Sequence, residues 1–145
     1  MTNLHIAIGL IVFLAIGVLL FRRDAISPTK HDTMTVTITS LDGGPDDLIG
    51  QLPVSAKILR MIPGIDRPDY FLAELTRPVS WTHDGQQTQI THLIVGAYLA
   101  GDSLQPGRRG IGLQIAYVTD SSLLADARLE FSKCYHCAIG FADIT

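Results

Sequence analysis

The segment CYHC at residues 134–137 brings together the residue types best suited to chemistry in this chain. Two cysteines separated by two residues can form a redox dithiol or half of a zinc site, and His136 adds a further potential ligand. Large apolar and polar or small side chains alternate over residues 128–141, which predicts a strand. Residues three apart in a strand point to opposite faces, with their α-carbons about 10 Å apart. This geometry favours a buried structural thiol at Cys137, with Cys134 and His136 on the other face.

His83 and Asp84 place an imidazole and a carboxylate side by side, as in the acid–base pair of many hydrolases. Such a pair needs a nucleophile within reach, and the sequence carries no nucleophile motif such as G-x-S-x-G. Asp84 also precedes Gly85, and an Asp-Gly pair is typical of the tight turn of a β-hairpin. We therefore expect a polar hairpin tip here, and the sequence supports no catalytic assignment.

Arg108 and Arg109 lie in a loop bounded by glycines, where backbone amides and two guanidinium groups could hold an anion or an acidic partner. The segment lacks the strand–loop–helix context and the lysine of a phosphate-binding loop, so a solvated loop is the simpler interpretation. Tryptophan and arginine often concentrate the binding energy of protein interfaces. The candidate binding residues are therefore these two arginines together with Trp81, His83 and Asp84.

An apolar run without charge, LHIAIGLIVFLAIGVLLF, extends over residues 4–21. At about 1.5 Å per residue, a helix of this length spans roughly 27 Å, close to the hydrocarbon thickness of a bilayer. A soluble helix would normally show a polar face, and this segment shows none. The run predicts a single membrane-spanning helix within an anchor at residues 1–23.

Arg22 and Arg23 follow the apolar run directly, and Lys30 lies close behind. Arginine and lysine beside a span favour the cytoplasmic side of the membrane. The sequence therefore predicts a signal anchor, with the N-terminus outside and the remainder of the chain in the cytoplasm; an extracytoplasmic domain is the alternative. A cleaved signal peptide is disfavoured, because the segment lacks a basic start and a small-residue cleavage site.

Residues 24–33 are polar, contain Pro28 and predict a short linker, which leaves residues 34–145 for one globular domain. The formal net charge of −3 arises from 11 basic and 14 acidic side chains that are scattered along the chain. Because no basic face or run emerges, the composition argues against nucleic acid as a partner.

The globular domain reads as a succession of strands and turns. Residues 34–39, MTVTIT, alternate strictly between apolar and polar side chains, and residues 88–99 become apolar on both faces, as in a covered central strand. Pro78 is expected to limit the strand that begins at Tyr70 to an edge or an end. Five to six strands with short turns predict a mainly β fold, an antiparallel barrel or a sandwich. The expected strands cover residues 34–39, 54–61, 70–77, 88–99, 111–117 and 128–141.

Residues 46–61 leave the secondary structure open. Alternation from Val54 onward indicates a strand, whereas Val54, Ile58 and Met61 also fit one face of a helix. We favour the strand, and a helix over this segment would make the domain α+β instead.

These features predict a single-pass membrane protein with a small β domain close to the bilayer. The size of the domain and the missing catalytic constellation favour a binding, scaffold or accessory module. Its expected partners are the lipid bilayer, through residues 4–21, and another protein, and no cofactor is expected. The alternative is a thiol or metal protein, or a small enzyme of unknown reaction, that uses Cys134, His136 and Cys137.

Overall fold

The predicted membrane helix, its flanking Arg22 and Arg23, and the linker lie outside the residues that the structure describes. Among the described residues, no helix is long and apolar enough to cross a bilayer. The computed structural model describes residues 34–62, 70–99, 101–129 and 131–145. Its elements are β1 (Thr35–Asp42), α2 (Asp46–Ile49), β2 (Val54–Ile62), β3 (Tyr70–His83), β4 (Gln86–Ala97), β5 (Ile111–Tyr117), the 3-10 helices η1 (Ser121–Ala125) and η2 (Phe131–Lys133), and β6 (Tyr135–Ile144).

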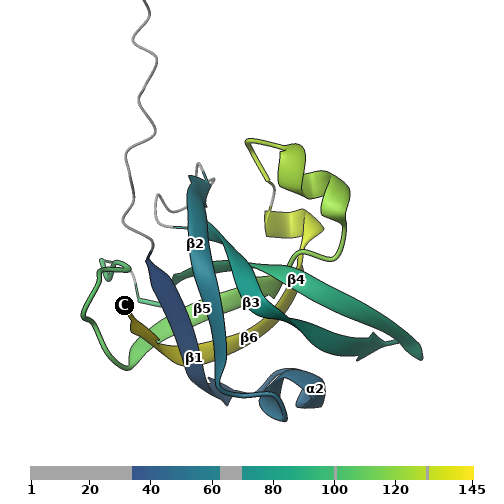
Figure 1. Ribbon diagram of the computed structural model, residues 1–145, viewed down its shortest axis with the longest axis horizontal. Helices are drawn as coiled ribbons and strands as arrows, with labels where there is room; N and C mark the ends of the chain where they lie inside the picture. Colours follow the sequence, from purple (N-terminus) through teal and green to yellow (C-terminus); the bar gives the residue numbers. More distant parts are fainter. Residues whose placement is uncertain (1–33, 63–69, 100, 130) are drawn as a thin grey trace, which may run out of the picture. The chain divides into compact units, whose positions relative to one another are not determined.

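Six antiparallel strands close into a barrel in which each strand pairs with its neighbours in sequence and β6 returns to β1 (Figure 1). Closure is completed where Thr35 and Thr145 exchange two backbone hydrogen bonds, with N···O distances of 2.7 and 2.9 Å. The prediction of a mainly β fold is confirmed, and the strands form a closed barrel rather than a sandwich.

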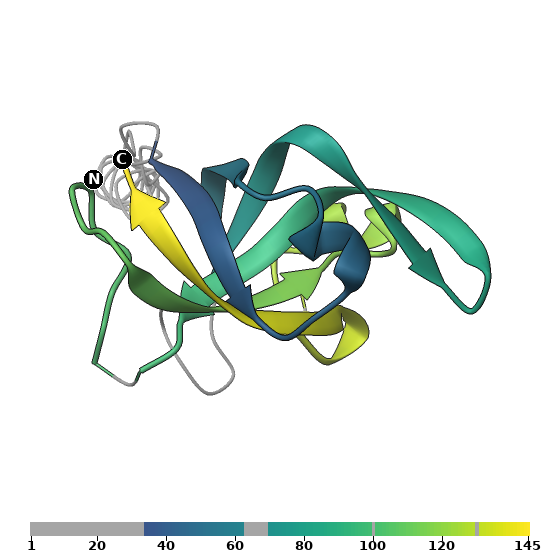
Figure 2. The same ribbon diagram turned by 90° about the horizontal axis from the view of Figure 1, so that it is seen from below.

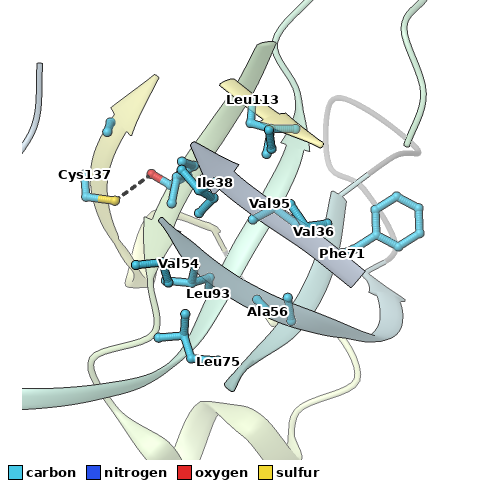
Figure 3. Close-up of a cluster of buried hydrophobic side chains, with 14 of the residues drawn as sticks. Val36, Ile38, Val54, Ala56, Phe71, Leu75, Leu93, Val95, Leu113 and Cys137 are labelled. Carbon is cyan, nitrogen blue, oxygen red and sulfur yellow. Dashed lines mark hydrogen bonds between the residues drawn. The ribbon is translucent and has the colours of Figure 1, made fainter. Parts of the chain in front are cut away.

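Apolar side chains from all six strands fill the barrel interior (Figure 3). Val36 and Ile38, two apolar positions of the alternating segment MTVTIT, are fully buried, as expected for a half-buried strand. Leu48 of α2 packs into this cluster from one end of the barrel, and Leu104, from the loop between β4 and β5, packs into it from the other. The core therefore has a cover at each end.

Residues 46–61 contain one short helical turn and a strand, and the alternative helix with Val54, Ile58 and Met61 on one face does not form. Residues 46–49 form the single turn of α2, and β2 follows from Val54 to Ile62. The predicted strand over residues 54–61 is confirmed, and a helix of four residues does not change the class of the fold.

A second apolar cluster lies outside the barrel, beneath the connection from β5 to β6. Arg60 ties this connection to β2, because its Nη1 and Nη2 atoms donate to the carbonyl oxygens of Ala127 and Asp126 at 3.1 and 2.6 Å. This cover explains why β4 is apolar on both faces, as predicted for a central strand. The buried members of the outer cluster are Ile62, Leu72, Ile94, Ala116, Val118 and Leu129.

β3 and β4 continue past the barrel as a two-stranded arm that ends in the predicted Asp84-Gly85 turn (Figure 2). The φ angles of 49° and 76° at this turn match the type I′ hairpin, which confirms that prediction. Pro78 does not end the strand, but it lies past the last pair of β3 with β2, Ala56–Leu75, so the alternative of an edge position holds. Residues 75–78 form a bulge between the pairs Glu74–His92 and Val79–Ile90, and a bulge accommodates proline because the ladder needs no donor there.

The last strand begins later than predicted, at Tyr135 instead of residue 128. Ala138 pairs with Ile115, whereas His136 pairs with the next residue of β5, so Cys137 is the extra residue of a β-bulge. The bulge reverses the alternation of faces, so the regular alternation predicted over residues 128–141 is wrong beyond Cys137. The positions buried there are Ala138, Gly140, Ala142 and Ile144.

Candidate functional site

Two hollows open at the end of the barrel that carries α2, and the same three rings contribute to the lining of both. We call the first the acidic pocket; its volume is about 410 Å³. The second measures about 320 Å³ and is lined by polar side chains of β4 and by Thr119 in addition to the rings. The acidic pocket is lined by Gly44, Pro45, Asp46, Asp47, Trp81, Thr82, His83, Tyr135 and Cys137.

The three shared rings belong to Trp81, His83 and Tyr135, and we call them the aromatic ridge. Trp81 and His83 stack with ring centroids 4.9 Å apart and an interplanar angle of 12°. The ring of Tyr135 lies 4.6 Å from that of Trp81 and 5.2 Å from that of His83. Trp81 is only 6% exposed and Tyr135 is 37% exposed, so Trp81 forms the buried base of the ridge and Tyr135 forms its accessible crest.

Strand geometry explains how the ridge forms. Trp81 and His83 are two residues apart on β3 and therefore project from the same face of the arm. Tyr135, at the start of β6, pairs with Tyr117 at the end of β5, and directly paired residues share a face. The ring of Tyr117 meets that of Trp81 edge to face, with centroids 5.4 Å apart, and so connects the arm to the barrel.

Hydrogen bonds from β3 and from the side chain of Gln51 hold α2 and its residue Asp47 in place. The backbone N–H of Thr82 donates to Oδ2 of Asp47 at 2.7 Å. Nε2 of Gln51 donates to the carbonyl oxygens of Asp47 at 2.6 Å and Ser80 at 3.1 Å, and Oε1 of Gln51 accepts from the N–H of Ser80 at 3.3 Å. These bonds hold the acidic turn against the arm.

Gly44 forms a wall of the acidic pocket that only glycine can supply. Its φ angle is +109°, a region that residues with a side chain rarely adopt. A Cβ atom there would lie 2.9 Å from the Cβ of Ala138 and 3.0 Å from the carbonyl oxygen of Cys137. The absence of a side chain therefore lets the turn before α2 lie directly against β6.

Tyr117 lies beside the acidic pocket with its polar group unsatisfied. Its hydroxyl is buried and makes no hydrogen bond to any part of the chain that the structure describes. Burial raises the pKa of Tyr117 above its ordinary value, and the nearby charges of Cys137, Asp47 and Tyr135 raise it further. All three of these neighbours line the acidic pocket, so the hydroxyl is close to its inner wall.

The two cysteines occupy different clusters and are not joined by a disulfide bond. Cys137 is buried in the barrel cluster, where its Sγ donates to the carbonyl oxygen of Ile115 at 3.2 Å, and burial raises its pKa to about 12. Cys134 packs against the outer cluster, and burial raises its pKa as well. The predicted burial of Cys137 is confirmed. A raised pKa suppresses the thiolate on which redox and metal chemistry depend.

His136, the remaining member of the CYHC segment, is exposed. Among the described residues, no group of three or more histidine, cysteine, aspartate or glutamate side chains is arranged to hold a metal ion.

Three of the five predicted binding residues come together at this end of the barrel. Trp81 and His83 belong to the aromatic ridge, and Nε2 of His83 lies 3.7 Å from Oδ2 of Asp84, with both side chains exposed. Arg108 and Arg109 lie at the opposite end, in the loop between β4 and β5. The prediction thus combined residues from two separate surfaces.

The arginine loop is held beside the end of β6. The N–H of Gly107 donates to the carbonyl oxygen of Ile144, and the N–H of Ile144 donates to that of Arg108, both at 2.8 Å. Nη2 of Arg108 lies 3.7 Å from Oδ1 of Asp102, and both side chains are partly exposed. Exposed pairs of this length contribute little to stability.

The sequence patterns do not identify Tyr135, Asp46, Asp47 or Tyr117 as site residues. Tyr135 lies in the alternating segment that predicts a strand, and the two aspartates follow a turn in which acidic residues are common. Neither signal distinguishes a pocket from an ordinary loop, because the pocket is assembled from three segments that are far apart in sequence.

Aromatic rings and two carboxylates line the acidic pocket, and its thiol is held in the neutral form by a raised pKa. Comparisons of the chain with protein families, with curated proteins and with solved structures found no match.

Proposed function

We propose that the protein is a single-pass membrane protein whose β-barrel binds another protein through the acidic pocket and the aromatic ridge. The observation that carries the proposal is the pocket itself. Its volume of about 410 Å³ lies within the usual range for ligand sites of about 300–1,000 Å³. Tryptophan and tyrosine are enriched among the residues that dominate protein interfaces, and both contribute rings to its wall.

The membrane part of the proposal is supported by the uncharged run at residues 4–21 and by Arg22 and Arg23, which favour a cytoplasmic barrel. The chain enters the barrel at Thr35, and the acidic pocket lies beyond the other end of β1. Eight residues of strand extend about 26 Å. In this arrangement the linker joins one end of the barrel and the partner binds at the other.

Fractionation of cells that produce the full chain tests the membrane part. We expect the chain to stay with the membranes through washing at alkaline pH and to require detergent for release, because the apolar run is embedded in lipid. A reporter fused after Thr145 should be active in a cytoplasmic assay. A chain released without detergent, or found without its first residues, would contradict the anchor.

Substitution on the ridge crest tests the binding part. Tyr135→Ala removes a ring that is 37% exposed, and Phe141→Ala removes a ring that is 45% exposed on the same strand but outside the acidic pocket. The detergent-solubilised full chain should co-purify with a defined partner in stoichiometric amount. We expect Tyr135→Ala to lose that partner and Phe141→Ala to retain it. Equal retention by the two variants would contradict the site.

A further inference from the structure

We propose that the acidic pocket receives a basic side chain, an arginine or a lysine, presented by the protein partner. The inference rests on the proposed function, since it names what the partner inserts. Two carboxylates, Asp46 and Asp47, line the pocket together with aromatic rings, and none of its lining residues is a lysine or an arginine.

The carboxylates have capacity for a cationic donor. Oδ2 of Asp47 accepts from Thr82, which fixes the orientation of that group and leaves its second oxygen available. Asp46 is exposed at the pocket, and Asp84 adds a third acidic side chain next to His83. Among the described residues, neither Asp46 nor Asp47 forms a salt bridge. An anionic ligand would be repelled here, whereas a guanidinium or ammonium group would be attracted.

The aromatic ridge supplies the second element of cation recognition. A cation is attracted to the face of an aromatic ring, most strongly to that of tryptophan, and a planar guanidinium also stacks on it. His83 stacks on one face of the buried Trp81, and Tyr135 stands beside both, so the rings that a cation can reach are those of His83, whose side chain is 51% exposed, and Tyr135. Rings and carboxylates on the same pocket wall fit an arginine or lysine better than they fit an uncharged aliphatic side chain.

The Tyr117 hydroxyl provides an independent indication of a missing donor. It is buried without a hydrogen-bond partner among the described residues, and buried polar groups are normally paired. Its neighbours Asp47, Cys137 and Tyr135 all belong to the pocket lining. An arginine carries five N–H donors in a fixed fork, enough to engage more than one acceptor of the pocket.

The chain contains one tryptophan, so the intrinsic fluorescence and the indole N–H resonance of Trp81 report directly on the ridge. The full chain in detergent micelles is titrated with N-acetyl-arginine amide, with N-acetyl-lysine amide and with the neutral, nearly isosteric N-acetyl-citrulline amide. We expect saturable changes of both signals with the two cationic probes at millimolar concentration, and at least about fivefold weaker binding of the citrulline probe.

Two aspartate variants localise the binding. Asp46→Asn removes one carboxylate of the pocket and keeps the bond between Asp47 and Thr82. Asp42→Asn is the matched control, since Asp42 is exposed nearby but does not line the pocket. We expect Asp46→Asn to weaken arginine binding about three- to fivefold and Asp42→Asn to leave it unchanged. Equal effects of the two variants, or equal binding of arginine and citrulline probes, would overturn the inference.

The partner assay separates this inference from the proposed function. Loss of the partner in Tyr135→Ala with no arginine binding would retain the proposed function and refute the basic side chain. Retention of the partner by Tyr135→Ala would refute the proposed function, and the inference with it, even if the isolated pocket bound arginine.

Discussion

Cys137 is the residue at which β6 changes its alternation, and its side chain fills the space that the bulge creates in the barrel. The thiol has a partner in the carbonyl oxygen of Ile115 and lies in apolar surroundings, so the neutral form is strongly favoured. The residue therefore links three properties of the fold: the register of β5 with β6, the packing of the core and the position of the pocket wall.

The raised pKa of Cys137 predicts a loss of stability at alkaline pH. Between pH 9 and pH 12 the unfolded chain releases this proton while the folded chain keeps it, because burial raises the pKa from 9.0 to about 12. The free energy of unfolding should then fall by up to about 1.4 kcal/mol per pH unit, with no contribution below pH 9. Denaturant titrations at pH 8 and pH 10.5 should show Cys137→Ala losing about 2 kcal/mol less than the wild type. Parallel losses would contradict the assignment.

Gly44 and Gly43 form a pair in which the same substitution has different consequences. Both have positive φ angles, of 109° and 80°, so alanine introduces backbone strain of about 1–2 kcal/mol at either position. A Cβ at Gly43 meets nothing within 4 Å, whereas one at Gly44 would clash with β6. We expect Gly44→Ala to destabilise the barrel by about 1–3 kcal/mol more than Gly43→Ala, measured by thermal unfolding. Equal destabilisation would mean that the turn moves freely away from β6.

At the scale of elements, α2 covers one end of the barrel, and the side chain of Gln51 helps to hold it there. The four-residue turn buries Leu48 and carries the two pocket carboxylates. Its attachment to β3 depends on the side chain of Gln51, which reaches both Asp47 and Ser80. The position of α2 at the pocket is therefore fixed by this side chain together with the bond from Thr82 to Asp47.

Gln51→Ala should weaken both the barrel and the pocket. The variant removes three hydrogen bonds and leaves backbone groups of Ser80 half-buried without them, at a cost of about 1–3 kcal/mol. Binding of N-acetyl-arginine amide should weaken as well, because Asp47 loses its fixed position. Gln87→Ala is the control, since its one bond, to Oγ of Ser80, is exposed and should contribute less than about 0.5 kcal/mol. Calorimetry and the Trp81 fluorescence titration measure the two effects.

Local patterns in the sequence predicted the elements whose structure depends on local chemistry. The alternation of residues 34–39 and the Asp84-Gly85 pair were sufficient for β1 and for the hairpin. The bulge at Cys137 was not predictable, because it is defined by pairing with β5 and leaves no signature in its own segment. The acidic pocket was not predictable for a related reason. Its walls come from a turn, an arm and the start of a strand, and only the closed barrel brings these segments together.

At the scale of the whole molecule, closure of the barrel separates two ends that carry different elements and side chains. One end holds α2, the arm and the acidic pocket, and the other holds the start of β1 and the loop of Arg108 and Arg109. A closed antiparallel ring leaves no unpaired edge in the barrel wall.

This separation predicts that the arginine loop does not influence the acidic pocket. The double variant Arg108→Gln/Arg109→Gln should bind N-acetyl-arginine amide as the wild type does, and its stability should change by less than about 0.5 kcal/mol, since the pair of Arg108 with Asp102 is exposed and long. The same fluorescence titration and a thermal melt provide the measurement. A change in affinity beyond about twofold would show that the two ends are coupled.

The adjacency of Thr35 and Thr145 makes the barrel a natural candidate for circular permutation. A peptide of a few residues would join these two positions, and the backbone could be reopened at Asp84-Gly85, an exposed turn beyond the closed ring. An anchor attached at the reopened turn would tether the molecule by its pocket end. The barrel could then be attached to a surface by either end without altering a single contact in the core.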